Sequence, residues 1–243
     1  MGAVKKDRNT VDAKSLASLL TLAKQELNLL YTEPPAIRNG GADEGWFCRE
    51  HTYHTYFLLR LLGYEADIEL GDFAVRMPTG FGVTSYETDS DHAWCAVRDL
   101  VPIDLSMDFR YRAELPKLES AIVGRDGVGP YKIFYFYGQP ELESWFRRAP
   151  ESPQIAYLVN DVARFDPIIL LNEPESFFFP TDSSGWLRLY GADIFCRITM
   201  HLYETVHARV RPLYAKFDSQ SAFRYVRTRY ASSRLDIEKM LSC

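Results

Sequence analysis

DHAWCAVRDLVPID, the stretch from Asp91 to Asp104, decides the fold that we expect for this chain. In a strand, successive side chains point to opposite faces, so His92 and Trp94 share one face and the residues between them point the other way. Arg98-Asp99 then turns the chain into a second short strand, residues 100–104. Two strands joined by a tight turn bring the imidazole of His92 and the carboxylate of Asp104 side by side.

Two helices are expected before this pair of strands. Apolar residues recur at helical spacing after Asp12, which is a plausible N-cap, at Leu16, Leu19, Leu20, Ala23, Leu27 and Leu30. A turn-rich loop, residues 38–45, separates this helix from a second one over residues 47–62. The second helix has one apolar stripe and ends at Gly63.

Strands follow the second helix. Residues 64–70 alternate apolar and acidic side chains, and residues 73–77 alternate again after Gly71-Asp72. The glycine predicts a tight hairpin or a bulged continuation between the two runs. Residues 78–90 are rich in Gly, Thr and Ser and predict a loop that could act as a lid over a site.

The second half of the chain predicts a strand over 131–137, a short helix over 140–148, another apolar run over 165–171, and helices over 191–217 and 219–241. Helices and strands do not alternate as βαβ units, so we expect an α+β protein. We divide it into a core, residues 1–110, and a region of additional strands and C-terminal helices, residues 111–243. The two parts are expected to form one compact unit.

Composition and charge narrow the classes of function. The chain has 243 residues, of which 47% are hydrophobic and 25% charged, as in ordinary globular proteins. Its net charge of −5 does not indicate the basic surface that nucleic-acid binding requires. Residues 186–243 carry ten Lys and Arg against five Asp and Glu. This basic region is either a solvated helix face or a docking surface for an acidic protein partner.

Location and cofactors are predicted mainly by what the sequence lacks. No apolar run is long enough for a bilayer, and no apolar stretch follows the charges near the N-terminus, so we expect a cytoplasmic protein without a membrane segment. Its four cysteines are irregularly spaced. The order of residues in Glu50-His51-x-x-His54 does not match a zinc helix, and Gly124–Gly129 lacks the residues of a phosphate loop. We therefore expect no metal and no cofactor.

The sequence contains three residues whose positions suit a common catalytic role: Cys48, His92 and Asp104. Cys48 lies in the first turn of a helix, where unpaired N–H groups and the helix dipole stabilise a thiolate and can hold an oxyanion beside it. A carboxylate that orients a histidine, which in turn activates a thiol, is the arrangement of a nucleophilic triad. Each residue alone has an ordinary structural explanation, namely a buried Cys, a hydrogen-bonded His and a turn-capping Asp. Their order and the elements that carry them favour the triad.

The same residues resemble a known family. Gly45-Trp46-Phe47-Cys48, with the helix end at Phe57–Gly63, resembles the nucleophile helix of the transglutaminase-like branch of papain-fold cysteine enzymes. Residues 91–97 are similar to the His-Ala-Trp strand of these enzymes, and residues 101–104 to their strand that ends in Pro-x-Asp. Arylamine N-acetyltransferases and peptide N-glycanases share this arrangement. The resemblance covers residues 41–106, about a quarter of the chain.

The resemblance implies a papain-like core with an antiparallel sheet packed on the nucleophile helix, extended by the helical C-terminal region. It implies a thiol protease-like hydrolase or an acyltransferase, with Cys48 as nucleophile, His92 as base and acid, and Asp104 as its orienting group. The substrate is a peptide, an amide or an acyl thioester, and Trp46 and Trp94 wall the cleft. Ala42 stands where many papain-like enzymes have an oxyanion-hole Gln, so backbone N–H groups, Trp46 or Gln25 would replace it.

One alternative belongs to a different class of function. A catalytically inactive relative could keep this fold and act as a binding module through its basic C-terminal helices. Arg224, Arg227 and Arg229 would then be the residues that matter.

Overall fold

The structure is a computed structural model that describes residues 13–30, 48–62, 64–85, 92–109, 112–147, 149–160, 199 and 201–205. Several predictions from the sequence lie outside these residues: Trp46, the apolar run 165–171, most of the two C-terminal helices, and the three arginines of the binding-module hypothesis. Within the C-terminal region, residues 201–205 are helical, as the sequence predicts.

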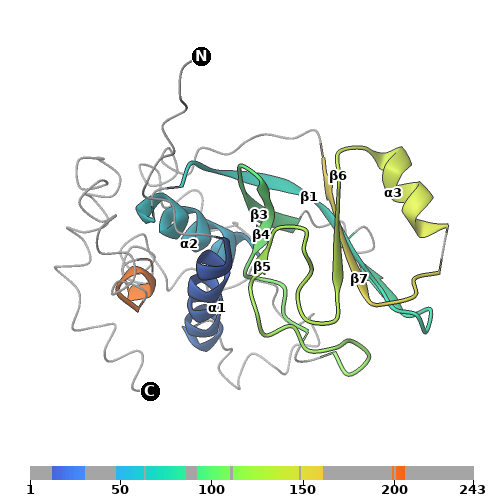
Figure 1. Ribbon diagram of the computed structural model, residues 1–243, viewed down its shortest axis with the longest axis horizontal. Coiled ribbons are helices and arrows are strands. Elements are labelled where there is room, and N and C mark those ends of the chain that lie inside the picture. Colours follow the sequence, from blue (N-terminus) through green and yellow to red (C-terminus); the bar gives the residue numbers. More distant parts are fainter. Residues whose placement is uncertain are drawn as a thin grey trace, which may run out of the picture.

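The protein is α+β, with helices grouped around one mixed sheet (Figure 1). The elements in chain order are α1 (Ala13–Leu30), α2 (Cys48–Leu61), β1 (Ala66–Arg76), β2 (Gly82–Thr84), β3 (His92–Val97), β4 (Leu100–Asp104), β5 (Ile122–Val123), β6 (Lys132–Phe136), α3 (Gln139–Phe146) and β7 (Gln154–Val159). The sheet has seven strands in the order β5-β4-β3-β1-β7-β6, and β2 pairs with β1. None of the described helices combines the length and the apolar composition that a membrane span requires.

The sheet is not wholly antiparallel, contrary to expectation. The β6 and β7 strands run parallel, because α3 carries the chain back between them as a crossover. The sequence analysis also missed β2, β5 and β7. The last of these matters most, because β7 is the interior strand that joins β1 to the edge strand β6.

The β1 strand is continuous through Gly71-Asp72, so the hairpin alternative is wrong. One half of β1 pairs with β3 and the other half with β7, and Gly71 is paired with both. A Cβ atom at Gly71 would lie 1.9 Å from the Leu158 carbonyl oxygen and 2.9 Å from Cη2 of Trp94. The glycine therefore serves close packing between strands rather than a turn.

Helices α2 and α3 cover one face of the sheet. Cys95 of β3 faces α2, since its Sγ lies 3.3 Å from the Thr52 carbonyl oxygen. Ala156 and Leu158 of β7 pack against Leu142 of α3. Figure 1 shows α1 and α2 beside β3, β4 and β5, and α3 at the other end beside β6 and β7.

The opposite face of the sheet carries a larger core. Trp94, Tyr157 and other aromatic and aliphatic residues of the sheet pack there against the segment between β4 and β6, which supplies Met107, Phe109, Leu115 and Leu118. This is the face on which His92 lies, 5.0 Å from the ring of Phe73 between centroids. The site therefore borders the main hydrophobic core.

The two long helices are buried to different extents. Leu16, Leu19, Leu20, Ala23 and Leu27 of α1 are fully buried, which confirms its predicted apolar stripe. In α2, every residue from 51 to 59 is buried, although the sequence predicts a single stripe. Its polar side chains are accommodated by hydrogen bonds, such as those of Thr52 to the Ala93 carbonyl and of His54 Nδ1 to Thr199 Oγ1. α2 is thus the central helix of the protein.

Candidate active site

The β3–β4 pair brings His92 and Asp104 together as the sequence predicts. Asp99 adopts a left-handed conformation (φ 66°) in the tight turn between the strands. Across the pair, His92 Nε2 lies 2.7 Å from Asp104 Oδ2, and both side chains are almost fully buried. This hydrogen bond leaves Nδ1 as the ring nitrogen available to another group.

Cys48 reaches the same imidazole from the start of α2. Thr52 lies one helical turn after Cys48 and is anchored by its 2.9 Å bond to the carbonyl of Ala93, the neighbour of His92. A hydrogen bond joins the side chains of Cys48 and His92. The Cys48 thiol is half-buried, whereas Cys95 is fully buried. The imidazole of His92 therefore links Cys48 to Asp104, and these are the three residues that the sequence predicts to act together.

Asp104 is held by more donors than His92 alone. Its Oδ1 accepts the Ser106 N–H and hydroxyl, each at 2.7 Å, and the Met107 N–H at 3.3 Å. Its Oδ2 accepts the Tyr157 hydroxyl at 2.8 Å in addition to His92. Burial raises the pKa of the Asp104 carboxyl, but His92, Ser106 and Tyr157 together hold it well below its usual range. Asp104 is thus an oriented carboxylate.

The charge of Asp104 controls the protonation of His92. Burial by itself lowers the pKa of His92, but the charge and hydrogen bond of Asp104, with a smaller contribution from Cys48, raise it to about 10. His92 is therefore an imidazolium at neutral pH. Burial, together with the charges of Asp104 and Glu69, raises the pKa of the Cys95 thiol, so Cys95 stays protonated.

We predict a pH dependence of stability from this pair. A histidine whose pKa is raised on folding stabilises the protein fully below the unfolded pKa of 6.5, and this contribution is lost as pH rises through about 10. The free energy of unfolding, measured by urea denaturation, should fall by on the order of a few kcal/mol across this window. His92→Gln should show a flatter profile. Equal slopes in the two proteins would contradict the raised pKa.

Tyr157 and Ser106 are the residues of the site that sequence reasoning missed. Gln154–Val159 is a short apolar run between Pro153 and Asn160, which is a strand signal that could have been recognised. Ser106 follows Asp104 by two residues, a spacing typical of a carboxylate that accepts bonds from its own turn. No local pattern links Tyr157 to Asp104, because they are 53 residues apart.

Trp94 belongs to the core rather than to the wall of an open cleft. Its indole is fully buried, with the ring centroid 5.8 Å from that of His92, and Nε1 donates to Glu69 Oε2 at 3.1 Å. The strand alternation that places Trp94 on the face of His92 also directs it inward. Gln25, considered for an oxyanion hole, is exposed on α1.

Among the described residues, the two histidines of α2 are not part of a cluster that could hold a metal ion. His51 and His54 are buried, and burial lowers the pKa of His51 to about 3, so it is neutral at physiological pH. Within the residues that the structure describes, no group of three or more His, Cys, Asp or Glu is arranged to hold a metal ion.

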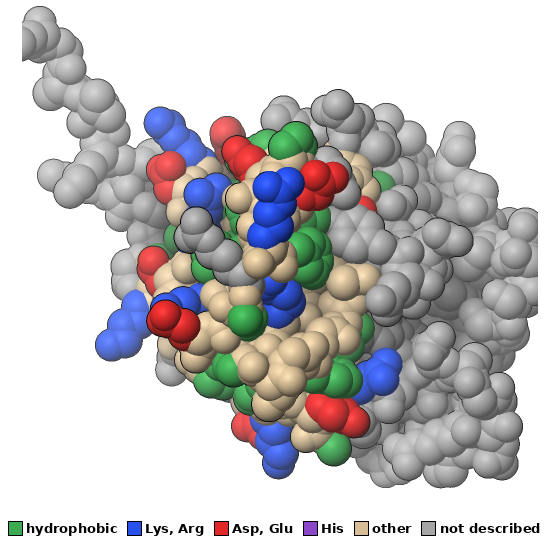
Figure 2. Space-filling model, turned by 90° about the vertical axis from the view of Figure 1, so that its right-hand side faces the viewer, with side chains coloured by type: hydrophobic (Ala, Val, Ile, Leu, Met, Phe, Trp, Pro, Cys, Tyr) green, Lys and Arg blue, Asp and Glu red, His purple; other side chains and the backbone are tan. Residues whose placement is uncertain are grey.

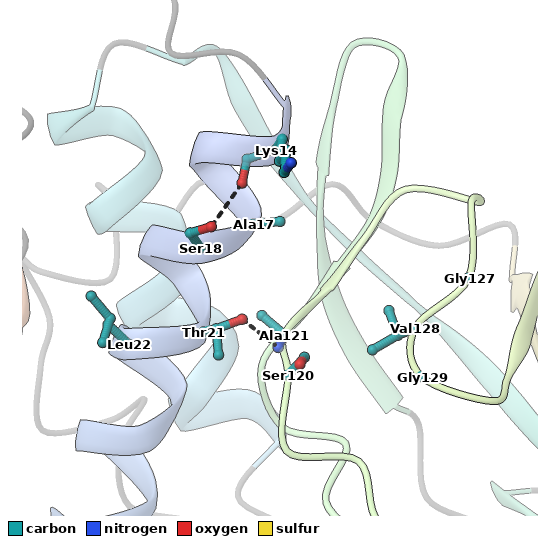
Figure 3. Close-up of a pocket in the computed structure, with 10 residues that line it drawn as sticks. All are labelled: Lys14, Ala17, Ser18, Thr21, Leu22, Ser120, Ala121, Gly127, Val128 and Gly129. Atoms are coloured by element: carbon teal, nitrogen blue, oxygen red, sulfur yellow. Dashed lines mark hydrogen bonds between the residues drawn. The ribbon is translucent and has the colours of Figure 1, made fainter.

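A pocket of about 580 Å³ lies away from the triad, between α1 and residues 120–129 (Figure 3). Its polar groups are largely engaged within the protein: Thr21 Oγ1 accepts the Ala121 N–H, and Ser18 donates to the Lys14 carbonyl. In the adjoining glycine-rich segment, the Val128 N–H is bonded to the Tyr131 carbonyl.

The surface beside α3 carries no concentration of one charge. Figure 2 shows acidic and basic side chains interspersed with apolar ones across the described part of this face. Arg76 lies over the ring of Trp145, 3.9 Å from its centroid, so this cation is already paired with an aromatic side chain. The described residues of this face therefore offer no charged docking patch.

No protein-family model matches the chain, and no curated protein or solved structure matches it either.

Proposed function

We propose that this protein is a transglutaminase-like cysteine enzyme that hydrolyses or transfers acyl groups through a thioester on Cys48. The observation that carries the proposal is the buried His92–Asp104 pair, bonded through Nε2, with the Cys48 thiol hydrogen-bonded to the same imidazole. A thiol, an imidazole and an orienting carboxylate in this order are the parts of a cysteine nucleophile and its base.

The reaction would proceed in two steps. The Cys48 thiolate attacks the carbonyl carbon of an amide or thioester, a C–S bond forms, and the carbonyl electrons move to oxygen. The unpaired N–H groups of a helix start, here that of α2, would stabilise that oxyanion. Collapse expels the amine or thiol, which takes its proton from the His92 imidazolium.

The second step restores the enzyme. Water or an acceptor amine attacks the thioester and gives its proton to His92, and the Cys48 thiolate leaves. Asp104 remains a carboxylate throughout and stabilises the imidazolium whenever it forms. The raised pKa of His92, about 10, keeps the imidazole protonated at neutral pH, so it can supply a proton to the leaving group.

Alkylation by iodoacetamide tests this proposal without a known substrate. At about pH 6 an ordinary thiol is almost entirely protonated and reacts slowly. Cys48 is half-buried, so an ordinary thiol in its place would react more slowly than free glutathione. We expect Cys48 instead to react faster than glutathione by on the order of tenfold or more.

Cys95 is the internal control for this experiment, because it is buried and its Sγ contacts the Thr52 carbonyl. Labelling of each cysteine is followed by peptide mass spectrometry. His92→Ala should remove the advantage of Cys48. The proposal would be contradicted if Cys48 reacted more slowly than glutathione and its alkylation rate did not change in His92→Ala.

A further inference from the structure

A lysine lies inside the apolar stripe of α1. Lys24 is fully buried, next to Ala23 and one turn before Asn28. Its Nζ donates to the carbonyl of Met107, to that of Leu118 at 2.9 Å and to that of Ser120 at 3.3 Å. An ammonium group has three donors, so three carbonyls match it fully. A buried lysine is rare unless its charge has such partners.

The Met107 main chain connects Lys24 to the candidate site. The Met107 carbonyl accepts from Lys24, and the Met107 N–H donates to Asp104 Oδ1. Ser106, the preceding residue, supplies the other two donors to the same oxygen. Lys24 thus holds the end of the turn whose N–H and hydroxyl groups orient the carboxylate, and it does so from 83 residues away.

The positive charge of Lys24 also complements the charges of the candidate triad, Cys48, His92 and Asp104. Burial is the main cause of the lowered pKa of His51; the charge of Lys24 lowers this pKa further, and the charge of Asp104 acts in the opposite direction. Lys24 and Asp104 therefore act electrostatically on the same buried histidine. An imidazolium at His92 balances the carboxylate of Asp104. A thiolate at Cys48 would leave the set one negative charge in excess, and the ammonium of Lys24 supplies the missing positive charge.

We propose that Lys24 is a positioning residue: by clamping the Met107 and Leu118 carbonyls to α1, it fixes the turn that aims Asp104 at His92 Nε2. The inference rests on the proposed function of Cys48, since only an active thiol makes this orientation consequential. It adds a residue outside the region of family resemblance that starts at residue 41.

The test compares Lys24→Met with Thr21→Val in the full chain. Both residues tie α1 to the same segment, because Thr21 Oγ1 accepts the Ala121 N–H at 3.1 Å (Figure 3). Only Lys24 is connected to the Asp104 turn. The readout is the NMR signal of the His92 ring N–H proton in histidine-labelled protein. If Lys24 had only a structural role in the core, its replacement would leave this signal unchanged. Its hydrogen bond to a buried carboxylate makes it a slowly exchanging signal.

Lys24→Met should abolish this signal through faster exchange and slow Cys48 alkylation by on the order of 10- to 100-fold. Thr21→Val should change neither. Lys24→Gln, which keeps an N–H donor for one carbonyl, replaces Lys24→Met if the latter does not fold. A wild-type ring-proton signal in the folded lysine variant overturns the proposal. Failure of both lysine variants to fold also overturns it, because Lys24 would then be a general core residue.

The two proposals can fail separately. The ring proton is also measured in Cys48→Ala, where it does not depend on the thiol. If wild-type Cys48 proves unreactive, the proposed function fails, while the ring-proton comparison still decides whether Lys24 positions Asp104.

Discussion

Cys48→Ser is expected to lower the rate at which p-nitrophenyl acetate acylates the protein by on the order of 10³-fold or more. A serine hydroxyl is a far weaker nucleophile than a thiolate, and His92 cannot ionise it in the ground state. The fold should survive, since serine suits a helix start. Release of p-nitrophenolate measures the rate, and mass spectrometry locates the acetyl group.

Cys95→Ser is the matched control for this change. Cys95 is buried against α2 and its thiol stays protonated, so acylation should remain close to that of the wild type. His92→Ala should lose nearly as much activity as Cys48→Ser, because the thiol then lacks its base. If Cys48→Ser were acylated as fast as the wild type, the thioester mechanism would have to be abandoned.

Asp104→Asn should also be severe, with a loss on the order of 10³- to 10⁴-fold. The carboxylate accepts from five groups: the Ser106 N–H and hydroxyl, the Met107 N–H, the Tyr157 hydroxyl and His92 Nε2. An asparagine has one acceptor oxygen, so its NH₂ group must face two or three of these donors. From the sequence alone, the expected loss of activity is smaller for Asp104→Asn than for His92→Ala, because the sequence does not reveal how many hydrogen-bond donors surround Asp104.

The mechanism of the loss is a change of tautomer. With the NH₂ group in the place of Oδ2, it donates to His92 Nε2, and the ring proton moves to Nδ1. Nδ1 is the nitrogen available to Cys48, and once protonated in a neutral ring it cannot accept the thiol proton. Acylation by p-nitrophenyl acetate and the NMR signature of the His92 tautomer should therefore change together.

Tyr157→Phe is the matched control for Asp104→Asn. It removes one donor from Oδ2 and leaves the carboxylate and its other partners in place. Activity should stay within about tenfold of the wild type, since a single hydrogen bond to a charged group contributes on the order of 1.5–3 kcal/mol and part of it is recovered by relaxation. An Asp104→Asn protein as active as Tyr157→Phe would refute the tautomer argument.

Local patterns in the sequence determined several parts of this protein. The periodicity of α1, the start of α2 at Cys48 and the β3–β4 pair all follow from spacing within a few residues. His92 and Asp104 are only 12 residues apart, and a tight turn closes that distance, so their hydrogen bond could be expected from the sequence. The candidate triad needs one longer step, the placement of α2 against β3.

The tertiary structure alone decided what surrounds that triad. Tyr157 reaches Asp104 because β7 joins the sheet beside β1. Lys24 reaches the Asp104 turn because α1 packs against the segment that carries Met107 and Leu118. The same packing buries α2 on all sides and directs Trp94 into the core. Hydrophobic periodicity reports which face of an element is buried, but it carries no information on which distant element covers that face. Strand order and helix docking supply that partner, and they arise only when the whole chain is packed.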